Sequence, residues 1–240
     1  MDVIKTALVT GGNKGLGFEM ARQLAGRGYK VWIGSRDRQR GEAAAAQLAA
    51  VGDVAVIELD VTNAASVAAA ARGLAAETDH LDVLINNAGI VSPNDGKPSE
   101  TAVDAIKSIF ETNLFGVLQV TQAFLPLVRK SLSGRIVVVS SGMGSLSRLA
   151  NPADSINRFG TWGYSASKAA VNALMISLAH ELRGTPVTVN AINPGFVATD
   201  INDNKGVLTV EQGVRRAIEL ATMESPPTGG FFNEAGVEPW

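Results

Sequence analysis

The sequence predicts an α/β fold: a doubly wound, mostly parallel sheet of about seven strands with helices on both faces. Two observations predict it. Short β-branched apolar runs alternate along the chain with longer, Ala-rich amphipathic stretches. The runs are apolar at successive positions, which is typical of parallel strands covered on both faces. The 240 residues, 46% of them hydrophobic, are enough for one domain with a sizeable core.

The elements follow from these two patterns in chain order. The Ala tracts look like low complexity, but alanine is the best helix former, so we predict ordinary helices there. No interior stretch has the composition of a linker, so we expect a single domain over 1–240. Strands are expected at 6–10, 30–34, 54–59, 82–87, 135–140, 187–192 and 229–232, and helices at 15–26, 39–50, 64–77, 113–130, 162–183 and 210–222.

Composition and charge exclude several classes of protein. The net charge of −2 gives no basic surface for nucleic acid. Without cysteine there are no disulfides or thiolate metal sites, which fits a reducing compartment. The N-terminus lacks the apolar stretch of a signal peptide, and no apolar run approaches the roughly 20 residues of a membrane span. We therefore expect a cytoplasmic protein with a small-molecule substrate and neither nucleic acid nor membrane as partner.

No metal site is predicted. His80 and His180 lie far apart in the sequence, and no carboxylate cluster has ligand spacing.

The segment "TGGNKGLG", residues 10–17, follows the first expected strand and opens the first helix. Glycines let the chain turn sharply and let a pyrophosphate approach the amides at a helix N-terminus. Its pattern is T-G-x-x-x-G-x-G; the alternative G-x-G-x-x-G fails because Met20 occupies the third glycine position. The setting indicates a dinucleotide loop in a Rossmann-like domain, although a tight turn alone remains the alternative.

T-G-x-x-x-G-x-G resembles the cofactor loop of the short-chain dehydrogenases/reductases. Further motifs of that family follow in order across nearly the whole chain: "LDVT" (59–62), "NNAG" (86–89), "TNLFG" (112–116), "VSS" (139–141), "YSASK" (164–168) and "NPGFVATD" (193–200). The resemblance implies a nicotinamide-dependent oxidoreductase, and it leaves homodimer, homotetramer and monomer all open.

The end of the second strand, "IGSRD", bears on the choice of cofactor. Ser35 stands where similar NAD enzymes usually carry Asp, and Arg36 follows it. An arginine here accommodates the 2′-phosphate of NADP, and Lys14 can reach the same phosphate. We therefore predict NADP(H), while Asp37 keeps open the ribose contact of an NAD enzyme. Asp60 is either an adenine contact, by resemblance, or a carboxylate at a helix N-terminus.

The resemblance also implies the remaining contacts of the cofactor. Asn86 is interpreted as structural, tying adjacent strands together, and Thr199 as a partner of the nicotinamide carboxamide. The full expected set of cofactor-binding residues is Gly11, Asn13, Lys14, Gly15, Leu16, Gly17, Ser35, Arg36, Asp60, Val61, Asn87, Ala88, Gly89, Tyr164, Lys168, Pro194, Gly195, Val197 and Thr199.

Tyr164 and Lys168 stand four residues apart on an expected helix, so their side chains share one face. An ammonium beside a phenol stabilises the phenolate, and we expect it to lower the pKa of Tyr164. By resemblance, Tyr164 donates the proton to a carbonyl oxygen, and Ser141 orients that carbonyl, with Ser140 the neighbouring alternative. Asn113 resembles the asparagine that supports a water linking the lysine to solvent; its alternative is a helix cap or kink.

Three segments are expected to shape the substrate pocket: about 91–100, 142–163 and 196–210. The 22 residues between Ser141 and Tyr164 exceed the spacing of the family's compact members and resemble the carbonyl-reductase branch, as does the C-terminal "PTGGFFNEAGVEPW". This extra stretch forms either a pocket wall or a cover over a helix surface, and Trp240 is expected to anchor the tail. Candidate apolar lining residues are Met143, Leu146, Phe159, Trp162 and Phe196.

The leading functional prediction is NADPH-dependent reduction of a ketone, aldehyde or quinone to an alcohol. A 3-oxoacyl-carrier-protein reductase is the rival within enzymes. From a different class, a non-catalytic NADP-binding sensor remains open, although such proteins often lose the tyrosine or lysine that is present here.

Overall fold

A computed structural model describes residues 4–240 of the chain. Within them, eight strands form one sheet in the order β3-β2-β1-β4-β5-β6-β7-β8. Every neighbouring pair is parallel except β7 and β8. The strands are β1 (Thr6–Thr10), β2 (Lys30–Ser35), β3 (Val54–Glu58), β4 (Val83–Asn86), β5 (Arg135–Val139), β6 (Thr188–Ile192), β7 (Phe231–Asn233) and β8 (Gly236–Val237).

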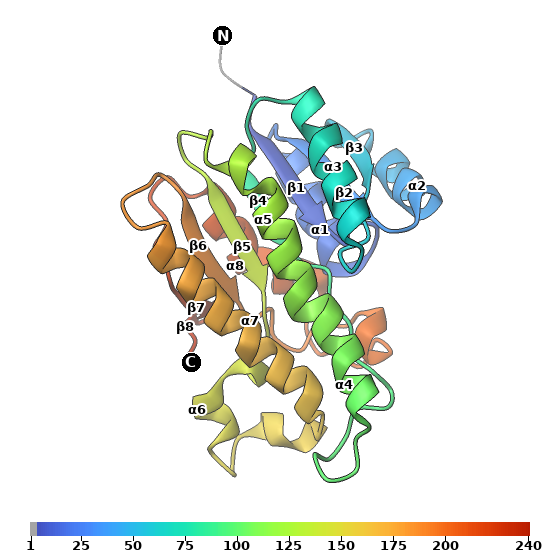
Figure 1. The fold of residues 1–240 in the computed structure, drawn as a ribbon, viewed down its shortest axis with the longest axis vertical. Helices are drawn as coiled ribbons and strands as arrows, with labels where there is room; N and C mark the ends of the chain where they lie inside the picture. Colours follow the sequence, from blue (N-terminus) through green and yellow to red (C-terminus); the bar gives the residue numbers. More distant parts are fainter. Residues whose placement is uncertain (1–3) are drawn as a thin grey trace.

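Helices cover both faces of this sheet (Figure 1). One face carries α1 (Gly15–Ala25), α2 (Arg38–Leu48) and α8 (Val210–Thr222). The other carries α3 (Ala64–Glu77), α5 (Val117–Val128) and α7 (Trp162–Glu181). Each face has its own buried cluster, centred on Met20, Ile33 and Ile85 under the first set and on Leu8, Phe124 and Met175 under the second. The doubly wound α/β fold expected from the sequence is confirmed.

Shorter helical segments join these layers. α4 (Val103–Phe110) runs into a π-helical segment (Glu111–Gly116), which continues directly into α5. The 22-residue stretch before Tyr164 contains a 3₁₀ turn (Gly142–Gly144), α6 (Leu146–Leu149) and a second 3₁₀ turn (Ser155–Phe159). A last 3₁₀ turn spans Asp200–Asn202.

The sequence misplaced some boundaries in this region. It predicted a helix beginning at 113, whereas the helical run begins ten residues earlier, at Val103. The stretch 146–160, where no helix was expected, contains α6 and a 3₁₀ turn, capped by the side chains of Ser145 and Asp154 respectively. The antiparallel strand β8 was also missed, because two residues are too few to show a period. The Ala tracts are helices, as predicted.

The strand order reverses between β1 and β4, which both pair along their length. In open α/β sheets, ligands bind at such a switch point, outside the carboxyl ends of the strands. The glycine segment 10–17 leaves the end of β1, and "NNAG" (86–89) leaves the end of β4. Two motifs that lie 70 residues apart in the sequence therefore meet at the site where the fold places ligands.

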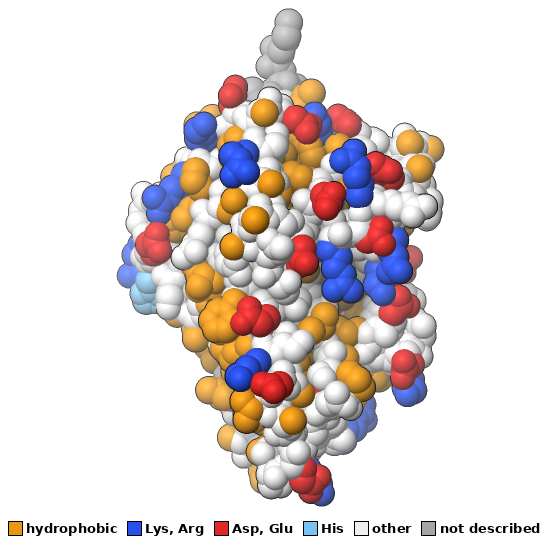
Figure 2. Space-filling model, turned by 45° about the vertical axis from the view of Figure 1, so that its right-hand side comes forward, with side chains coloured by type: hydrophobic (Ala, Val, Ile, Leu, Met, Phe, Trp, Pro, Cys, Tyr) orange, Lys and Arg blue, Asp and Glu red, His pale blue; other side chains and the backbone are white. Residues whose placement is uncertain are grey.

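Acidic and basic side chains intermingle on the face shown in Figure 2, so that face carries no large area of a single charge. None of the helices between residues 4 and 240 is both long enough and apolar enough to span a bilayer.

Candidate active site

The glycine segment turns so tightly that side chains would not fit in it. Gly11 has a φ of +63° and Gly15 a φ of +55°, in the region that favours glycine. A Cβ on Gly17 would come within 2.3 Å of the Gly11 carbonyl oxygen. The helix α1 then begins at Gly15, with Lys14 at its N-cap making no side-chain bond to the first-turn amides. Uncapped amides with a favourable helix dipole fit a phosphate group well.

The motif after β4 holds the glycine segment in place. The Thr10 hydroxyl accepts hydrogen bonds from the backbone amides of Asn87 and Ala88, at 2.9 and 3.0 Å. In return, Asn87 Nδ2 donates to the carbonyl oxygens of Thr10 and Gly11. Asn86 was expected to join adjacent strands, but its Nδ2 donates instead to the Thr121 hydroxyl on α5. That correction follows from its side chain pointing to the helical layer at the end of β4.

The end of β2 presents one free cation and an occupied carboxylate. Ser35 is buried and donates its hydroxyl proton to the Asp37 carbonyl oxygen at 2.7 Å. The Asp37 carboxylate caps α2 by accepting from the Arg40 amide and also pairs with the Arg40 guanidinium. Arg36 is exposed and forms no ion pair with any residue from 4 to 240. At the end of β2, the exposed Arg36 guanidinium is therefore open to a ligand, whereas the Asp37 carboxylate is already hydrogen-bonded to Arg40.

Lys14 pairs with an acidic residue from the segment that follows β6. Its Nζ pairs with Asp200 Oδ2 at 2.7 Å, and both side chains are about two-thirds exposed, at 63% and 65%. The Lys14 ammonium lowers the pKa of the Asp200 carboxyl. The sequence could not show this contact, because Asp200 lies 186 residues away. The expected contact of Lys14 with a 2′-phosphate stays a prediction.

Other expected cofactor residues lie on the segments that follow β3 and β6. Asp60 accepts two bonds from Thr62, through its amide and its hydroxyl, and the N-cap of α3 is Asn63 rather than Asp60. Gly195 has a φ of +80° in the turn after β6, and the Gly15 Cβ position would lie 3.6 Å from the Thr199 methyl. The glycine segment and the "NPGFVATD" segment thus face one another across a narrow gap, and their roles toward a cofactor stay predictions.

The four expected catalytic residues converge at the carboxyl ends of β4 and β5. Tyr164 and Lys168 both lie in the first turns of α7, with the Lys168 Nζ 5.6 Å from the centre of the Tyr164 ring. Lys168 is buried, and its Nζ donates to the Val139 carbonyl oxygen at 2.8 Å. Ser141 follows β5 and begins the 3₁₀ turn, where its hydroxyl accepts from the Met143 amide.

The ionisation of this set differs from the expectation in one respect. Burial raises the pKa of Tyr164 to about 12, and a hydrogen bond with Ser141 opposes this only in part. The expected lowering is therefore wrong, because desolvation of the phenolate is the largest influence on the pKa of Tyr164. The Lys168 Nζ donates one of its hydrogen bonds to the Val139 carbonyl oxygen. Burial also lowers the pKa of Lys168, to about 8. At neutral pH, Tyr164 holds its proton and Lys168 is mostly charged.

Asn113 lies in the π-helical segment and is fully buried. Its Oδ1 accepts from the Ile90 amide at 2.8 Å, while its Nδ2 donates to the Ile90 carbonyl and to the Ser167 hydroxyl. A Cβ on Gly89 would lie 3.4 Å from Asn113 Oδ1 and 3.6 Å from Lys168 Nζ. The structure therefore places Asn113 beside the lysine, across Gly89.

Ser140, the alternative to Ser141, is buried, and its hydroxyl has no hydrogen-bond partner among residues 4–240. Since Ser141 reaches Tyr164 and Ser140 does not, Ser141 is the better candidate for contact with a substrate carbonyl.

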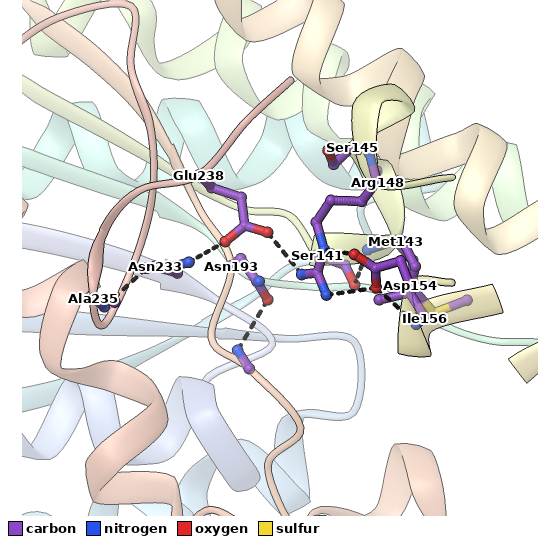
Figure 3. A network of polar contacts seen from close by, with 12 residues as sticks. Ser141, Met143, Ser145, Arg148, Asp154, Ile156, Asn193, Asn233, Ala235 and Glu238 are labelled. Atoms are coloured by element: carbon purple, nitrogen blue, oxygen red, sulfur yellow. Dashed lines mark hydrogen bonds and ion pairs between the residues drawn. The ribbon is translucent and has the colours of Figure 1, made fainter. Parts of the chain in front are cut away.

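The stretch between Ser141 and Tyr164 is joined to the C-terminal tail by a network of polar contacts (Figure 3). The Arg148 guanidinium donates two bonds to Asp154, both 2.9 Å, and one to Glu238, 2.8 Å. Glu238 is buried and also accepts from Asn233 at the end of β7. The Asp154 and Glu238 carboxylates raise the pKa of Arg148, and the Arg148 guanidinium lowers the pKa of Asp154. Trp240 stacks on Phe231 and accepts from the Ser147 amide, so it anchors the tail as predicted.

This network lies against the serine turn. A Cβ on Gly142, the residue after Ser141, would come within 2.5 Å of Arg148 Nη1 and 2.9 Å of Asn193 Nδ2. The stretch also meets the third expected pocket segment, since the rings of Phe159 and Phe196 lie 5.4 Å apart. Both contacts favour a pocket wall over a helix cover. Among the other apolar candidates, Met143 is half-buried, whereas Leu146 and Trp162 are exposed.

Sequence reasoning missed several polar residues around the site: Asp95, Arg148, Asp200 and Glu238. Each acts through a partner far along the chain or through burial, neither of which leaves a local pattern. Within residues 4–240, no three His, Cys, Asp or Glu side chains are grouped to hold a metal ion, and His80 pairs with Asp82.

The geometry can now be compared with known proteins. Residues 5–207 match the family model described as short chain dehydrogenase. A short-chain dehydrogenase, anuI, from Penicillium roqueforti is 36% identical over 227 residues, covering 91% of this chain and 89% of that protein. The (+)-neomenthol dehydrogenase of Arabidopsis thaliana is 33% identical over 287 residues, with 96% of each chain covered.

The fold is also similar to that of a solved structure. A carbonyl reductase from chicken fatty liver, solved with NADPH bound, superposes with a TM-score of 0.87 at 26% identity, covering 99% of each chain. Enzymes of this family are oxidoreductases that bind a nicotinamide cofactor, and the glycine segment at the switch point of this sheet fits such a group. The chain belongs to the short-chain dehydrogenase family.

Proposed function

We propose that this protein reduces a ketone, aldehyde or quinone carbonyl to an alcohol with NADPH, in one domain over 1–240. The observation that carries the proposal is the half-buried phenol of Tyr164, which lies beside the Ser141 hydroxyl and the Lys168 ammonium. The carbonyl reductase with NADPH bound and the neomenthol dehydrogenase support the same class of substrate.

The bound cofactor would supply the hydride that adds to the carbonyl carbon. Tyr164 then gives its proton to the carbonyl oxygen, so that the product is a neutral alcohol and the side chain becomes a phenolate. The raised pKa keeps that proton on Tyr164 until the oxygen gains charge. Lys168, fixed by Val139, stabilises the phenolate through its positive charge. Ser141 orients the carbonyl through its hydroxyl, and Asn113 holds the strand end beside Lys168.

The preference for NADPH rests on the end of β2. Asp37 is committed to capping α2, Ser35 carries no charge, and Arg36 is exposed with no ion-pair partner in the described chain. A 2′-phosphate would find a cation here, whereas the ribose of NAD would find no free carboxylate. Lys14 can join Arg36 only by leaving Asp200.

The segments 91–100, 142–163 and 196–210 are proposed to form the substrate pocket, with Phe159 and Phe196 as an apolar wall. The 22 residues before Tyr164 distinguish this proposal from a 3-oxoacyl-carrier-protein reductase. We further propose a cytoplasmic location on the absence of cysteine.

The test measures the loss of NADPH absorbance with a panel of ketones, aldehydes, quinones and an acetoacetyl thioester, each repeated with NADH. We expect turnover of the first three groups and faster reaction with NADPH. Preferred turnover of the thioester would favour the carrier-protein rival. Tight NADPH binding without turnover of any substrate would favour the non-catalytic sensor over an enzyme.

A further inference from the structure

The helix that carries Tyr164 and Lys168 is capped by a residue from a distant loop. Asp95 Oδ1 accepts from the Gly163 amide at 3.0 Å, and Asp95 Oδ2 accepts from the Tyr164 amide at 2.8 Å. The local N-cap residue of α7, Thr161, makes no side-chain hydrogen bond. First-turn amides have no partner inside a helix, so the carboxylate of Asp95 does the work that an N-cap side chain ordinarily does. Its negative charge also suits the helix N-terminus.

The loop that carries Asp95 is held in place at several points. Where the loop leaves β4, both backbone groups of Ile90 are bonded to Asn113. Beyond Asp95, the Gly96 amide donates to the Thr101 hydroxyl, which in turn donates to the Lys97 carbonyl. These contacts fix the carboxylate relative to the π-helical segment, so Asp95 links the surroundings of Asn113 to the start of α7.

The close approach of this loop to α7 depends on a residue without a side chain. A Cβ on Gly163 would lie 3.1 Å from Asp95 Oδ1 and 2.3 Å from the Ile106 side chain on α4. Glycine is one of the poorest helix formers, yet it stands at the second position of α7. The packing of Asp95 and Ile106 against this position explains why glycine is tolerated there.

Tyr164 lies in the first turn of α7, the turn whose amides Asp95 binds, and Lys168 lies one turn further on. The loss of a cap loosens the first turn before the second. We propose that Asp95 is a positioning residue that fixes the phenol of Tyr164 relative to Ser141 and Lys168. The inference depends on the proposed function for its kinetic readout, but not for the spectroscopic one.

The first measurement follows Tyr164 directly, without turnover. The chain has two tyrosines, and Tyr29 lies near Asp82 and Arg135 at the amino ends of the strands, whereas Tyr164 lies at their carboxyl ends. Carbon NMR of protein with labelled tyrosine therefore gives two ring signals, assigned with Tyr164→Phe. In Asp95→Ala we expect the Tyr164 signal to move or to split into several, while the Tyr29 signal stays. An unmoved Tyr164 signal in folded Asp95→Ala would overturn the proposal.

The second measurement is kcat at saturating NADPH on the best carbonyl substrate of the panel. A small displacement of a catalytic group costs up to about a hundredfold in rate, so we expect a fall of about tenfold or more for Asp95→Ala, with the Kd for NADPH nearly unchanged. Asp95→Asn keeps one oxygen acceptor and should retain an intermediate kcat.

Two matched variants separate positioning from a general loss of stability or charge. Asn63 caps α3 through two amide bonds of 3.0 and 3.1 Å, so Asn63→Ala removes the same kind of cap from a helix without a catalytic residue. Asp104→Asn removes an exposed carboxylate from the neighbouring α4. Both should keep wild-type kcat; an equal fall in Asn63→Ala and Asp95→Ala would refute positioning. If no carbonyl is reduced by the wild type, the proposed function fails, and the NMR arm still decides the role of Asp95.

Discussion

Two ion pairs flank the candidate active site, and they differ in their exposure to water. In the stretch before Tyr164, Arg148 meets Glu238, whose side chain is 1% exposed, and a second carboxylate, Asp154, holds the same guanidinium. At the glycine segment, Lys14 meets Asp200 with both side chains largely in water. The contacts are of equal length, 2.8 and 2.7 Å, so length does not separate them.

Surroundings do separate the two pairs. A buried carboxylate without its partner loses hydration that nothing replaces, whereas an exposed one is solvated again at once. We infer that the Arg148–Glu238 pair is fixed when the protein folds, whereas Lys14, at the glycine segment, can exchange Asp200 for another anionic partner. The expected catalytic residues Lys168 and Asn113 resemble the Arg148–Glu238 pair in this respect, since both are buried and hydrogen-bonded to the backbone.

The largest expected effect tests the fixed end. Tyr164→Phe removes the proton donor and little volume, so kcat for carbonyl reduction should fall by a factor on the order of 10³. Binding of NADPH, measured by fluorescence or calorimetry, should stay within about twofold. Substantial retained kcat would show that another group donates the proton.

The second prediction compares the two ion pairs directly. Glu238→Ala removes the buried acceptor of Arg148 Nη1 and Asn233 Nδ2, while Arg148 keeps both bonds to Asp154, so the free energy of unfolding should fall by about 1–3 kcal/mol. Asp200→Ala should leave the denaturation midpoint nearly unchanged, because its charge is fully solvated. Denaturant unfolding measures both, and Glu238→Gln, which keeps an oxygen toward Asn233, serves as the conservative control. Equal denaturation midpoints for the two alanine variants would show that the buried and the exposed ion pair contribute equally to stability, contrary to the inference.

The third prediction concerns pH. Burial lowers the pKa of Lys168 from its ordinary 10.5 to about 8, so the ammonium is present below pH 8 and lost above it. Because the ammonium stabilises the phenolate formed during reduction, kcat should be level near neutrality and fall about tenfold per unit once pH exceeds 8. A pH–rate profile at saturating NADPH measures this. A rate that rises through this range would contradict the assignment of Lys168.

The smallest expected effect tests the exchangeable end. Lys14→Ala combined with Arg36→Ala should weaken NADPH binding by about tenfold and leave NADH binding unchanged, since only NADPH carries the 2′-phosphate. Asp200→Asn releases Lys14 and should tighten NADPH by about two- to threefold, with little effect on NADH. Measured dissociation constants for both cofactors check these values. Equal losses for the two cofactors would mean that neither cation reads the phosphate.

Local patterns were sufficient for the framework of this protein. The pattern of apolar residues placed the seven parallel strands to within a few residues. Buried strands and amphipathic helices each require apolar side chains at regular, closely spaced positions, so their burial can be predicted from the sequence. The spacing of Tyr164 and Lys168 was equally local, since four residues make one helical turn. The glycine segment was readable because its tight turn demands glycine itself.

Contacts between distant segments were decided only by the tertiary structure. The direction of the Tyr164 pKa depended on how completely packing removes water from the phenol, and no spacing of residues states that. Lys14 meets Asp200, 186 residues away, a contact that no local pattern indicates. Asp95 and Glu238 each act on a partner more than 60 residues distant. Sequence by itself therefore determined the elements and the family motifs, whereas partners and ionisation depended on three-dimensional proximity and burial, which have no period along the chain.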